Sequence, residues 1–330
     1  MLLILADSTD PWATLVHREA LRTGGDVVWI EPAQLLDRVL LNWPVVTGEA
    51  VVAGSLVIDG REILLRDLTG VLSGLPFPLR LNLEDLSASD TEYVTKEATA
   101  AWLAFLNAMP CSVVNRPIPG GRSTLLTGSP LLARLAAEHG FLLPASRCTS
   151  SQADAVQQFT TWGESAYLKP LGSIEPGLYL NATDGGDQIC RVMERQAVSL
   201  QRIPEGQQAT VYVVGSEIAA TVLHSGDDAK RKIDLVSAQA APCLGLVRAL
   251  GLSFAECQLV ITPEGPSYWL DVSGAPNIWR CPQEVQPQIV RRLLIHLSET
   301  RSESTHDSLN GSDGRSSTRE RMRPTRSPER

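Results

Sequence analysis

The pattern of apolar and polar positions at the start of the chain changes between two periods. An unbroken apolar run over residues 2–5 predicts a buried strand, and residues 12–25 then place apolar side chains at helical spacing before two glycines. Residues 27–32 return to a strand pattern, and residues 68–77 predict a later strand. This strand, helix, strand order predicts a small parallel α/β unit over about residues 1–115.

Two further elements of this unit have recognisable end signals. Residues 51–65 predict a β-hairpin that turns at Asp59 and Gly60, a pair that favours the tight turns of hairpins. Residues 91–109 are rich in helix formers and predict a long helix that ends before Pro110.

The second half of the chain mixes the two periods. Helical spacing recurs in four stretches, at residues 129–140, 154–162, 239–251 and 284–299. Strand patterns occur in six stretches, at residues 166–171, 198–203, 209–215, 217–224, 254–261 and 267–272. Because several of these strands follow one another directly, we predict an α+β unit rich in antiparallel pairs over about residues 145–300.

The last thirty positions differ in composition from the rest. Residues 301–330 consist mainly of Arg, Ser, Thr, Glu and Pro, with scarcely an apolar side chain. Such a segment cannot bury enough apolar surface to offset the entropy of ordering it, so we predict a disordered tail. A role as an arm that binds nucleic acid or a partner protein is the alternative, against which the interspersed acids count.

The overall composition limits the class of protein. With 43% hydrophobic and 20% charged residues, the chain is typical of soluble globular proteins. The net charge of −8 argues against a general nucleic-acid-binding surface, because phosphate contacts need clustered Lys and Arg. Six cysteines are scattered without a CxxC pair, and no window approaches the apolar length of a membrane span. We therefore predict a reduced, cytoplasmic protein with neither nucleic acid nor membrane as a partner.

Three charged residues stand in otherwise apolar strand patterns of the second half. Lys169, one of only four lysines in the chain, lies inside AYLKPLG. Glu256 and Asp271 lie on successive strands joined by a turn, so they can face each other across a hairpin and share a cation. A magnesium ion that bridges phosphates needs one or two such carboxylates, and a lysine supplies a point charge to the phosphates. An edge-strand lysine in solvent and an acid that caps a turn are the alternatives.

The order of several stretches resembles the ATP-grasp superfamily, and within it the peptide ligases that include ribosomal-protein glutamate ligases and the maturases of graspetides such as microviridins. The resemblance spans about residues 1–295. Its carriers are TEYVTKEATAAWLAFLNAM followed by CSVVNRP, then GFLLP, YLKPLG, the spacing from SLQRIPEG to VYVVG, and YWLDVSGAPNIW. It implies an N-terminal α/β domain (1–115), an ATP-grasp domain (116–300) that holds the nucleotide between antiparallel sheets, and the tail (301–330).

The resemblance also implies roles for particular residues. Lys169 would bind the α- and β-phosphates of ATP, and residues 199–203 would form the strand against adenine, which includes Gln201, Arg202 and Ile203. Glu256 and Asp271 would hold Mg²⁺. The implied reaction activates a carboxylate as an acylphosphate, which an amine or hydroxyl of a peptide or small molecule attacks. Positioning and charge neutralisation would supply the catalysis, and relatives are often oligomers, so a homo-oligomer is possible.

The chain departs from the family pattern where ligands are expected. Ser129 stands where a phosphate-binding lysine is usual, Thr210 where a basic residue is common, and Ser273 where an asparagine completes the magnesium site. Asn277 is a candidate replacement ligand, and Arg122 or Arg116 a candidate replacement cation. A catalytically impaired relative with an accessory or regulatory role is therefore the alternative to a working ligase.

Other chemistry-bearing residues have ordinary explanations. We expect NRPIPGG and TDGGDQ to be plain loops, although the second could cover a nucleotide. His224, with Ser225, Asp227 and Asp228, is expected in a surface loop. His17 and His139 are expected on solvated helix faces, and Trp269 and Trp279 in the core.

Overall fold

A computed structural model gives the arrangement of most of the chain. It describes residues 1–42, 54–81, 83–117, 130–173, 176–224, 230–262, 265–277 and 280–299. Within them no helix is long and apolar enough to cross a membrane. All six cysteines are free thiols, as expected for a reduced protein.

The first sheet is parallel, as the sequence predicts. Its strands are β1 (Leu2–Leu5), β2 (Val27–Ile30), β6 (Gly70–Ser73) and β7 (Ser112–Val113), in the order β2-β1-β6-β7. Helix α1 (Pro11–Arg22) begins after Asp10, whose side chain accepts a hydrogen bond from the Ala13 N–H. Helix α2 (Ala88–Ala108) begins after Ser87 in the same way and buries Trp102 and Phe105.

A small antiparallel sheet adjoins this unit, with the strands β3 (Val39–Asn42), β4 (Ser55–Ile58) and β5 (Arg61–Leu64). The hairpin predicted at Asp59 and Gly60 is confirmed, and both residues have positive φ, of 47° and 82°. Strand β3 was not predicted: it buries only Val39, whereas β1, of equal length, is buried throughout.

The second sheet is antiparallel, with the order β10-β9-β11-β8. It consists of β8 (Ser146–Thr149), β9 (Ala166–Pro170), β10 (Leu178–Leu180) and β11 (Val198–Arg202). Helices α5 (Gln152–Thr161) and α6 (Gly185–Met193) cover one face. The prediction of a plain loop at TDGGDQ is therefore wrong: α6 begins at Gly185, where a glycine lets the helix approach the ring of Phe159.

The third sheet is also antiparallel, with the order β14-β13-β12-β15-β16. Its strands are β12 (Gln207–Val214), β13 (Glu217–His224), β14 (Lys230–Ile233), β15 (Phe254–Ile261) and β16 (Tyr268–Ser273). One face packs against α4 (Pro130–Glu138) and α7 (Ser237–Ala249). All six strands predicted in the second half are present, and β8, β10 and β14 are additional.

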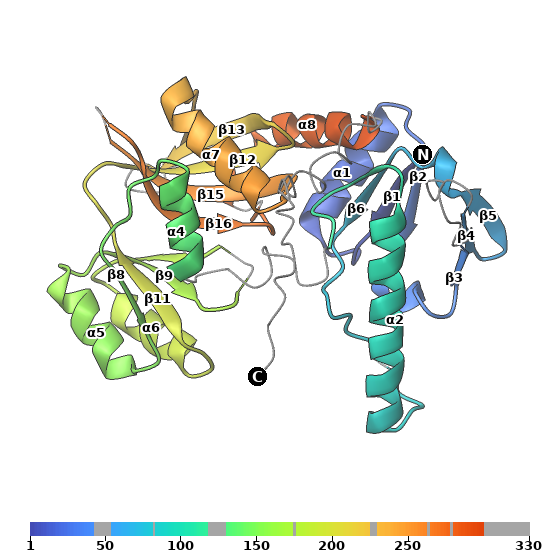
Figure 1. Cartoon of the computed structure of the whole chain (residues 1–330), viewed down its shortest axis with the longest axis horizontal. Coiled ribbons are helices and arrows are strands. Elements are labelled where there is room, and N and C mark those ends of the chain that lie inside the picture. The colour runs from blue at the N-terminus through green and yellow to red at the C-terminus, as the bar shows by residue number, and fades with distance from the viewer. Residues whose placement is uncertain are drawn as a thin grey trace, which may run out of the picture. The chain divides into compact units, whose positions relative to one another are not determined.

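Helix α8 (Gln286–Ser298) joins the third sheet to the parallel one (Figure 1). One hydrophobic core contains Leu293 and Leu297 of α8, Ile4 of β1 and Tyr212 of β12. Gly70 of β6 lies so close to the Leu297 backbone that a side chain there would collide with it. Residues up to Thr300 form one compact unit. The domain boundary at residue 115 stays a prediction, and the predicted tail lies outside the described residues.

Candidate functional site

Strand alternation places a row of polar side chains on the second sheet, on the face away from its helices. Ala166 and Leu168 of β9 pack beneath α5 and α6, so the side chains between and after them project from the opposite face. These are Tyr167 and Lys169, and on the neighbouring strand β11 the equivalent residues are Ser199 and Gln201. All four are buried.

A β-bulge turns Asp271 toward the same region. Gln258 of β15 pairs with Asp271, but the next residue, Leu259, pairs with Trp269, so Leu270 is an extra residue in β16. Trp269 therefore packs in the core beneath α7, whereas Leu270 packs against Tyr167 of the second sheet. In a regular strand Asp271 and Trp269 would share a face. The bulge is what makes the carboxylate available to the site.

Asp271 and Lys169 form a buried ion pair between the second and third sheets. The Lys169 Nζ lies 2.7 Å from the Asp271 Oδ2, and the two side chains are 1% and 2% exposed. The same oxygen accepts hydrogen bonds from the Tyr167 hydroxyl at 3.0 Å and the Gly177 N–H at 3.2 Å. Lys169 is thus not the solvated edge-strand lysine that the sequence left open.

Glu256 is the second buried carboxylate, and it is a diagonal neighbour of Asp271. Glu256 pairs with Ser273 and Gln258 pairs with Asp271 across β15 and β16. One oxygen of Glu256 accepts from the Gln258 side-chain amide, and the other accepts from the Asn277 N–H at 2.6 Å. Burial raises the pKa of Glu256 to about 7, although the Asn277 N–H and the charge of Arg280 oppose the shift.

A chain of hydrogen bonds runs from Glu256 to His224 with a defined direction. The Gln258 amide nitrogen faces Glu256, so its oxygen must accept from the Tyr179 hydroxyl (3.1 Å) and from the Thr210 hydroxyl (3.0 Å). The Thr210 hydroxyl has only one proton, and it donates that proton to Gln258. The 2.6 Å contact between its Oγ1 and the His224 Nε2 therefore requires a proton on that nitrogen.

His224 and Thr210 thus have structural roles that the sequence did not indicate. His224 is half-buried at the end of β13, and its ring centre lies 6.0 Å from that of Tyr179. Thr210 is fully buried. Residues 225–229, which hold the remaining polar residues of that predicted loop, lie outside the described part of the chain.

The tyrosines of the site are neutral hydrogen-bond donors. Burial is the main cause that raises the pKa of Tyr167 well above its usual value, and the charge of Asp271 adds to it. Burial likewise raises the pKa of Tyr179 and Tyr212. The formal charges of the site therefore come from Lys169, Arg280, Asp271 and the titratable Glu256.

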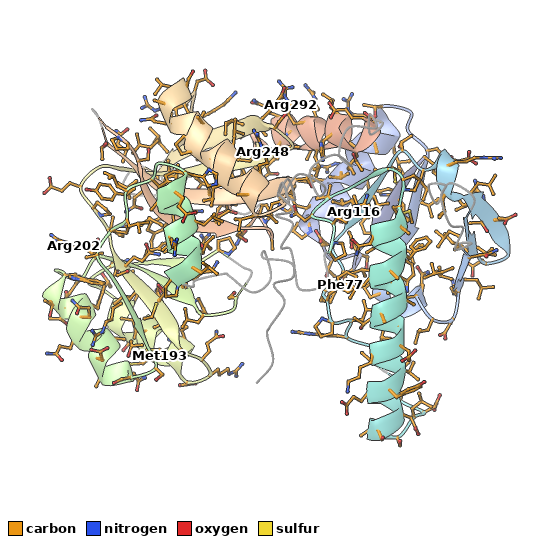
Figure 2. The ribbon with its side chains drawn as sticks, in the orientation of Figure 1. Phe77, Arg116, Met193, Arg202, Arg248 and Arg292 are labelled. Carbon is orange, nitrogen blue, oxygen red and sulfur yellow. The ribbon has the colours of Figure 1, made fainter. Side chains whose placement is uncertain are left out.

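The predicted adenine strand is β11, and its three candidate residues differ in setting. Gln201 is buried and donates from its side-chain nitrogen to the Leu270 carbonyl at 2.6 Å, which links the second and third sheets. Its Oε1 is buried without a hydrogen-bond partner among the described residues. Ile203 packs beside Tyr167, whereas Arg202 is exposed at the strand end (Figure 2). Gln201 and Ile203 thus lie beside the site, and their role toward adenine stays a prediction.

The carboxylates of Glu256 and Asp271 are suitable ligands for a magnesium ion that is also coordinated by phosphate oxygens. Each oxygen of Glu256 has one of the donors named above, which leaves a second lone pair for a metal. The donors given for Asp271, including Lys169, all lie on its Oδ2, so its Oδ1 is the oxygen that would meet a metal, and a phosphate is an anion that could take the lysine. Asn277 contacts Glu256 through its backbone, and the Ser273 hydroxyl accepts from the Ala275 N–H at 3.0 Å. The described residues contain no cluster of three or more His, Cys, Asp or Glu side chains at metal-binding distance, so phosphate oxygens would have to complete the site.

The two arginines proposed as replacement cations have different outcomes. Arg116 is unsuitable, because its guanidinium donates to the carbonyls of Leu106, Asn107, Met109 and Cys111 at the end of α2 (Figure 2). The hypothesis that it compensates in the site is therefore wrong. Arg122 and Ser129 lie outside the described residues, as does Trp279.

Asn115, which precedes Arg116, fixes the third sheet to the parallel one. Its side-chain oxygen accepts from the Ser253 and Phe254 N–H groups, and its nitrogen donates to the carbonyls of Phe254 and Gly274. These bonds hold the start of β15 and the end of β16, two residues from Glu256 and one from Ser273. Sequence reasoning noted the NRP stretch but not this function.

Sequence reasoning also missed Tyr167, Tyr179, Gln258 and Arg280. Two of them had a usable signal: Tyr167 is two residues before Lys169, and Gln258 is two residues after Glu256, so each shares a strand face with a residue already singled out. Tyr179 and Arg280 come from short or irregular segments, and only tertiary structure brings them to the site.

Comparisons with known proteins agree with this geometry. No protein-family model matches the chain, and no curated protein sequence matches it. Among solved structures, macrocyclase MdnC from Microcystis aeruginosa MRC, bound with precursor peptide MdnA, is similar with a TM-score of 0.63 at 14% identity, over 89% of this chain and 99% of that one. ATP-grasp ligase PsnB, complexed with precursor peptide PsnA2 and AMPPNP, gives 0.63 at 16% identity, over 90% and 97%. A RimK domain ATP-grasp protein from Sphaerobacter thermophilus DSM 20745 gives 0.51 at 16% identity, over 89% and 98%.

These similarities identify the fold. The chain has the ATP-grasp fold, with a parallel N-terminal sheet followed by antiparallel sheets, and the predicted fold class is confirmed. The resemblance stated from sequence motifs is confirmed as a structural match over about nine-tenths of the chain. Identities of 14–16% carry no residue roles with them.

Proposed function

We propose that this ATP-grasp chain is an ATP-dependent ligase that joins a carboxylate to an amine or hydroxyl, with a peptide as substrate. The observation that carries the proposal is the buried pair of Lys169 and Asp271 between two antiparallel sheets, with Glu256 diagonal to the acid. A fold rarely buries a lysine and two acids together for stability, because desolvation opposes it. A site that exchanges these partners for phosphate and metal explains the arrangement.

The chain's residues would act through position and charge. Lys169 would hold phosphate oxygens of ATP, and Glu256 and Asp271 would hold magnesium, which neutralises charge on the phosphates when bound. The substrate carboxylate would attack the terminal phosphorus, and ADP would leave. An amine or hydroxyl would then attack the acylphosphate carbon, with loss of phosphate and of its own proton. Adenine would lie beside Gln201 and Ile203 of β11.

A peptide substrate is supported by the structural relatives. MdnC and PsnB are described with bound precursor peptides, and PsnB also with magnesium and ADP. The second candidate function is a nucleotide- or peptide-binding accessory protein without turnover. Neutral Thr210 and Ser273, at positions where the resembled family has a base and a metal-binding asparagine, favour it.

Calorimetric titration with AMPPNP tests the nucleotide site directly. We expect binding that strengthens when Mg²⁺ is added, and loss of binding in Lys169→Met. Lys96→Met is the matched control, because Lys96 is exposed on α2 and pairs only with Glu92 among the contacts given for it. Absence of AMPPNP binding to the wild-type chain at millimolar concentration would rule out the ligase.

Turnover separates the two candidate functions. The wild-type chain would be incubated with ATP, Mg²⁺ and synthetic peptides encoded next to its gene, and ADP and peptide mass would be measured. A ligase releases one ADP for each water lost from the peptide. An accessory protein binds AMPPNP but leaves the peptide mass unchanged.

A further inference from the structure

Arg280 donates one hydrogen bond at the edge of the candidate site and keeps a second buried nitrogen. Its Nη2 lies 2.6 Å from the Gly177 carbonyl. Its Nη1 is buried and has no hydrogen-bond partner among the described residues. A guanidinium carries five N–H donors in a fixed plane, so fixing one nitrogen also fixes the direction of the other. A buried, unpaired charged donor is unfavourable, which indicates a site for an anionic partner.

The Gly177 peptide connects Arg280 to the ion pair. Its N–H donates to the Asp271 Oδ2, which also accepts from Lys169, and its carbonyl accepts from Arg280. Only glycine permits this, because a side chain at position 177 would collide with the Leu168 carbonyl and the Tyr167 ring. Gly177 therefore links Arg280, through its carbonyl, to the acid that Lys169 binds, through its N–H.

Arg280 is also linked to the metal-binding end of the site. Its backbone N–H donates to the Asn277 carbonyl at 3.2 Å, and the Asn277 N–H donates to Glu256 at 2.6 Å. Arg280 thus lies within electrostatic reach of the carboxylate proposed to hold magnesium. A magnesium ion held there would neutralise charge on the phosphates of ATP.

We propose that Arg280 binds the terminal phosphate of ATP through Nη1 and so supplies the cation that Thr210 does not provide. The inference rests on the proposed function and deepens it. A guanidinium suits this task, because it meets phosphate oxygens with paired N–H groups and keeps its charge when buried. The same nitrogen could instead meet the carboxylate of the substrate, which is an oxyanion of similar geometry.

Binding of two nucleotides distinguishes these partners. The full-length chain and its Arg280→Gln and Arg280→Lys variants would be titrated with AMPPNP and with ADP, both with Mg²⁺. We expect Arg280→Gln to weaken AMPPNP binding about tenfold or more, and ADP binding by less than about threefold, since only AMPPNP carries the phosphate whose charge-assisted hydrogen bond the variant loses. Arg280→Lys should lose less, because it keeps the charge. Arg248→Gln is the control, since Arg248 is exposed on α7 (Figure 2).

The outcomes separate this inference from the proposed function. If the wild-type chain binds neither nucleotide, the proposed function fails and this inference fails with it. If the wild-type chain binds both and Arg280→Gln, folded by circular dichroism, binds both equally well, Arg280 does not contact the nucleotide and a substrate carboxylate becomes its partner. Equal losses for ADP and AMPPNP would also overturn the assignment to the terminal phosphate. Should Arg280→Gln not fold, the Arg280→Lys titration decides by the same comparison of the two nucleotides.

Discussion

The Lys169 Nζ lies 2.7 Å from the Asp271 Oδ2, and this contact joins β9 of the second sheet to β16 of the third. Both side chains are almost completely buried. The pair keeps a cation and an acid ready at the junction of the two sheets, where each neutralises the other. A phosphate that takes Lys169 would leave Asp271 without its cation, and a metal bound to Asp271 would replace that charge, so the two ligands should bind together.

The ion pair gives a first test in the free protein. Lys169→Met leaves Asp271 buried without a counter-charge, and we expect it to lower the free energy of unfolding by about 3–5 kcal/mol. The double variant Lys169→Met, Asp271→Asn removes both charges and should lose clearly less. Urea unfolding of the four proteins of this cycle measures the coupling. A double variant as unstable as the sum of the two single ones would contradict the pairing.

Glu256 gives a pH dependence with a defined sign. Its pKa is raised from 4.5 to about 7 in the folded chain, so the folded state binds its proton more tightly than the unfolded state. Its contribution to stability is complete below the unfolded pKa and is lost as the pH rises toward the folded value. At about 1.4 kcal/mol per pKa unit, we expect a loss of about 2–3 kcal/mol between pH 5 and pH 8.

Glu256→Gln is the control for this pH dependence, because the amide does not titrate. Chemical unfolding of both proteins over the pH range measures the difference. The wild-type curve should fall relative to that of the variant as the pH rises. Parallel curves would show that Glu256 titrates alike in the folded and unfolded chains.

Two buried threonines on neighbouring strands, Thr210 and Thr221, allow a controlled test of the hydrogen bonds that run from Glu256 to His224. Thr210→Val removes the acceptor of the His224 Nε2 and one donor to Gln258, so we expect a loss of about 1–3 kcal/mol in the free energy of unfolding. Thr221→Val should change it by less than about 0.5 kcal/mol or raise it, because the Thr221 Oγ1 is buried without a partner among the described residues. Equal losses of unfolding free energy in the two variants would show that the hydrogen bonds of Thr210 do not stabilise the fold.

The series of hydrogen bonds from Glu256 to His224 also fixes the tautomer of His224. Because Thr210 donates to Gln258, neutral His224 should carry its proton on Nε2. Long-range ¹H–¹⁵N correlation spectra of ¹⁵N-histidine-labelled protein distinguish the tautomers, with His224→Gln assigning the signal. In Thr210→Val the preference of neutral His224 for a proton on Nε2 should weaken. If the neutral imidazole of His224 carried its proton on Nδ1 in the wild-type protein, the hydrogen bonds between Gln258, Thr210 and His224 would run in the opposite direction.

Helix α8 depends on a close approach to Gly70. Gly70→Ala would place a methyl group against the Leu297 backbone and force α8 away from β6, and we expect a loss of more than about 2 kcal/mol in the free energy of unfolding. Gly186→Ala in α6 should raise it by up to about 1 kcal/mol, because nothing lies within 4 Å of the added carbon and alanine favours helix. Urea unfolding measures both.

Much of the fold followed from the sequence because its elements have strong local signals. The apolar runs of β1 and β15 and the turn at Asp59 and Gly60 act within a few residues. Strands β3 and β10 escaped prediction, because β3 buries only Val39 and β10 has only three residues. TDGGDQ misled, since its first glycine, Gly185, allows close contact with Phe159 at the start of α6 rather than a turn.

The sequence by itself singled out three of the charged residues of the candidate site, and it missed Arg280. Lys169, Glu256 and Asp271 stand out because a charge in an apolar strand must find a partner. Only the tertiary structure decided how they meet: the bulge at Leu270 turns Asp271 to the face away from Trp269, and Gly177 donates to Asp271 while its carbonyl accepts from Arg280. Strand periodicity acts along the chain, whereas a bulge and a close backbone contact depend on the partner strand. For that reason the pattern identified the residues, and the packing of the sheets set their geometry.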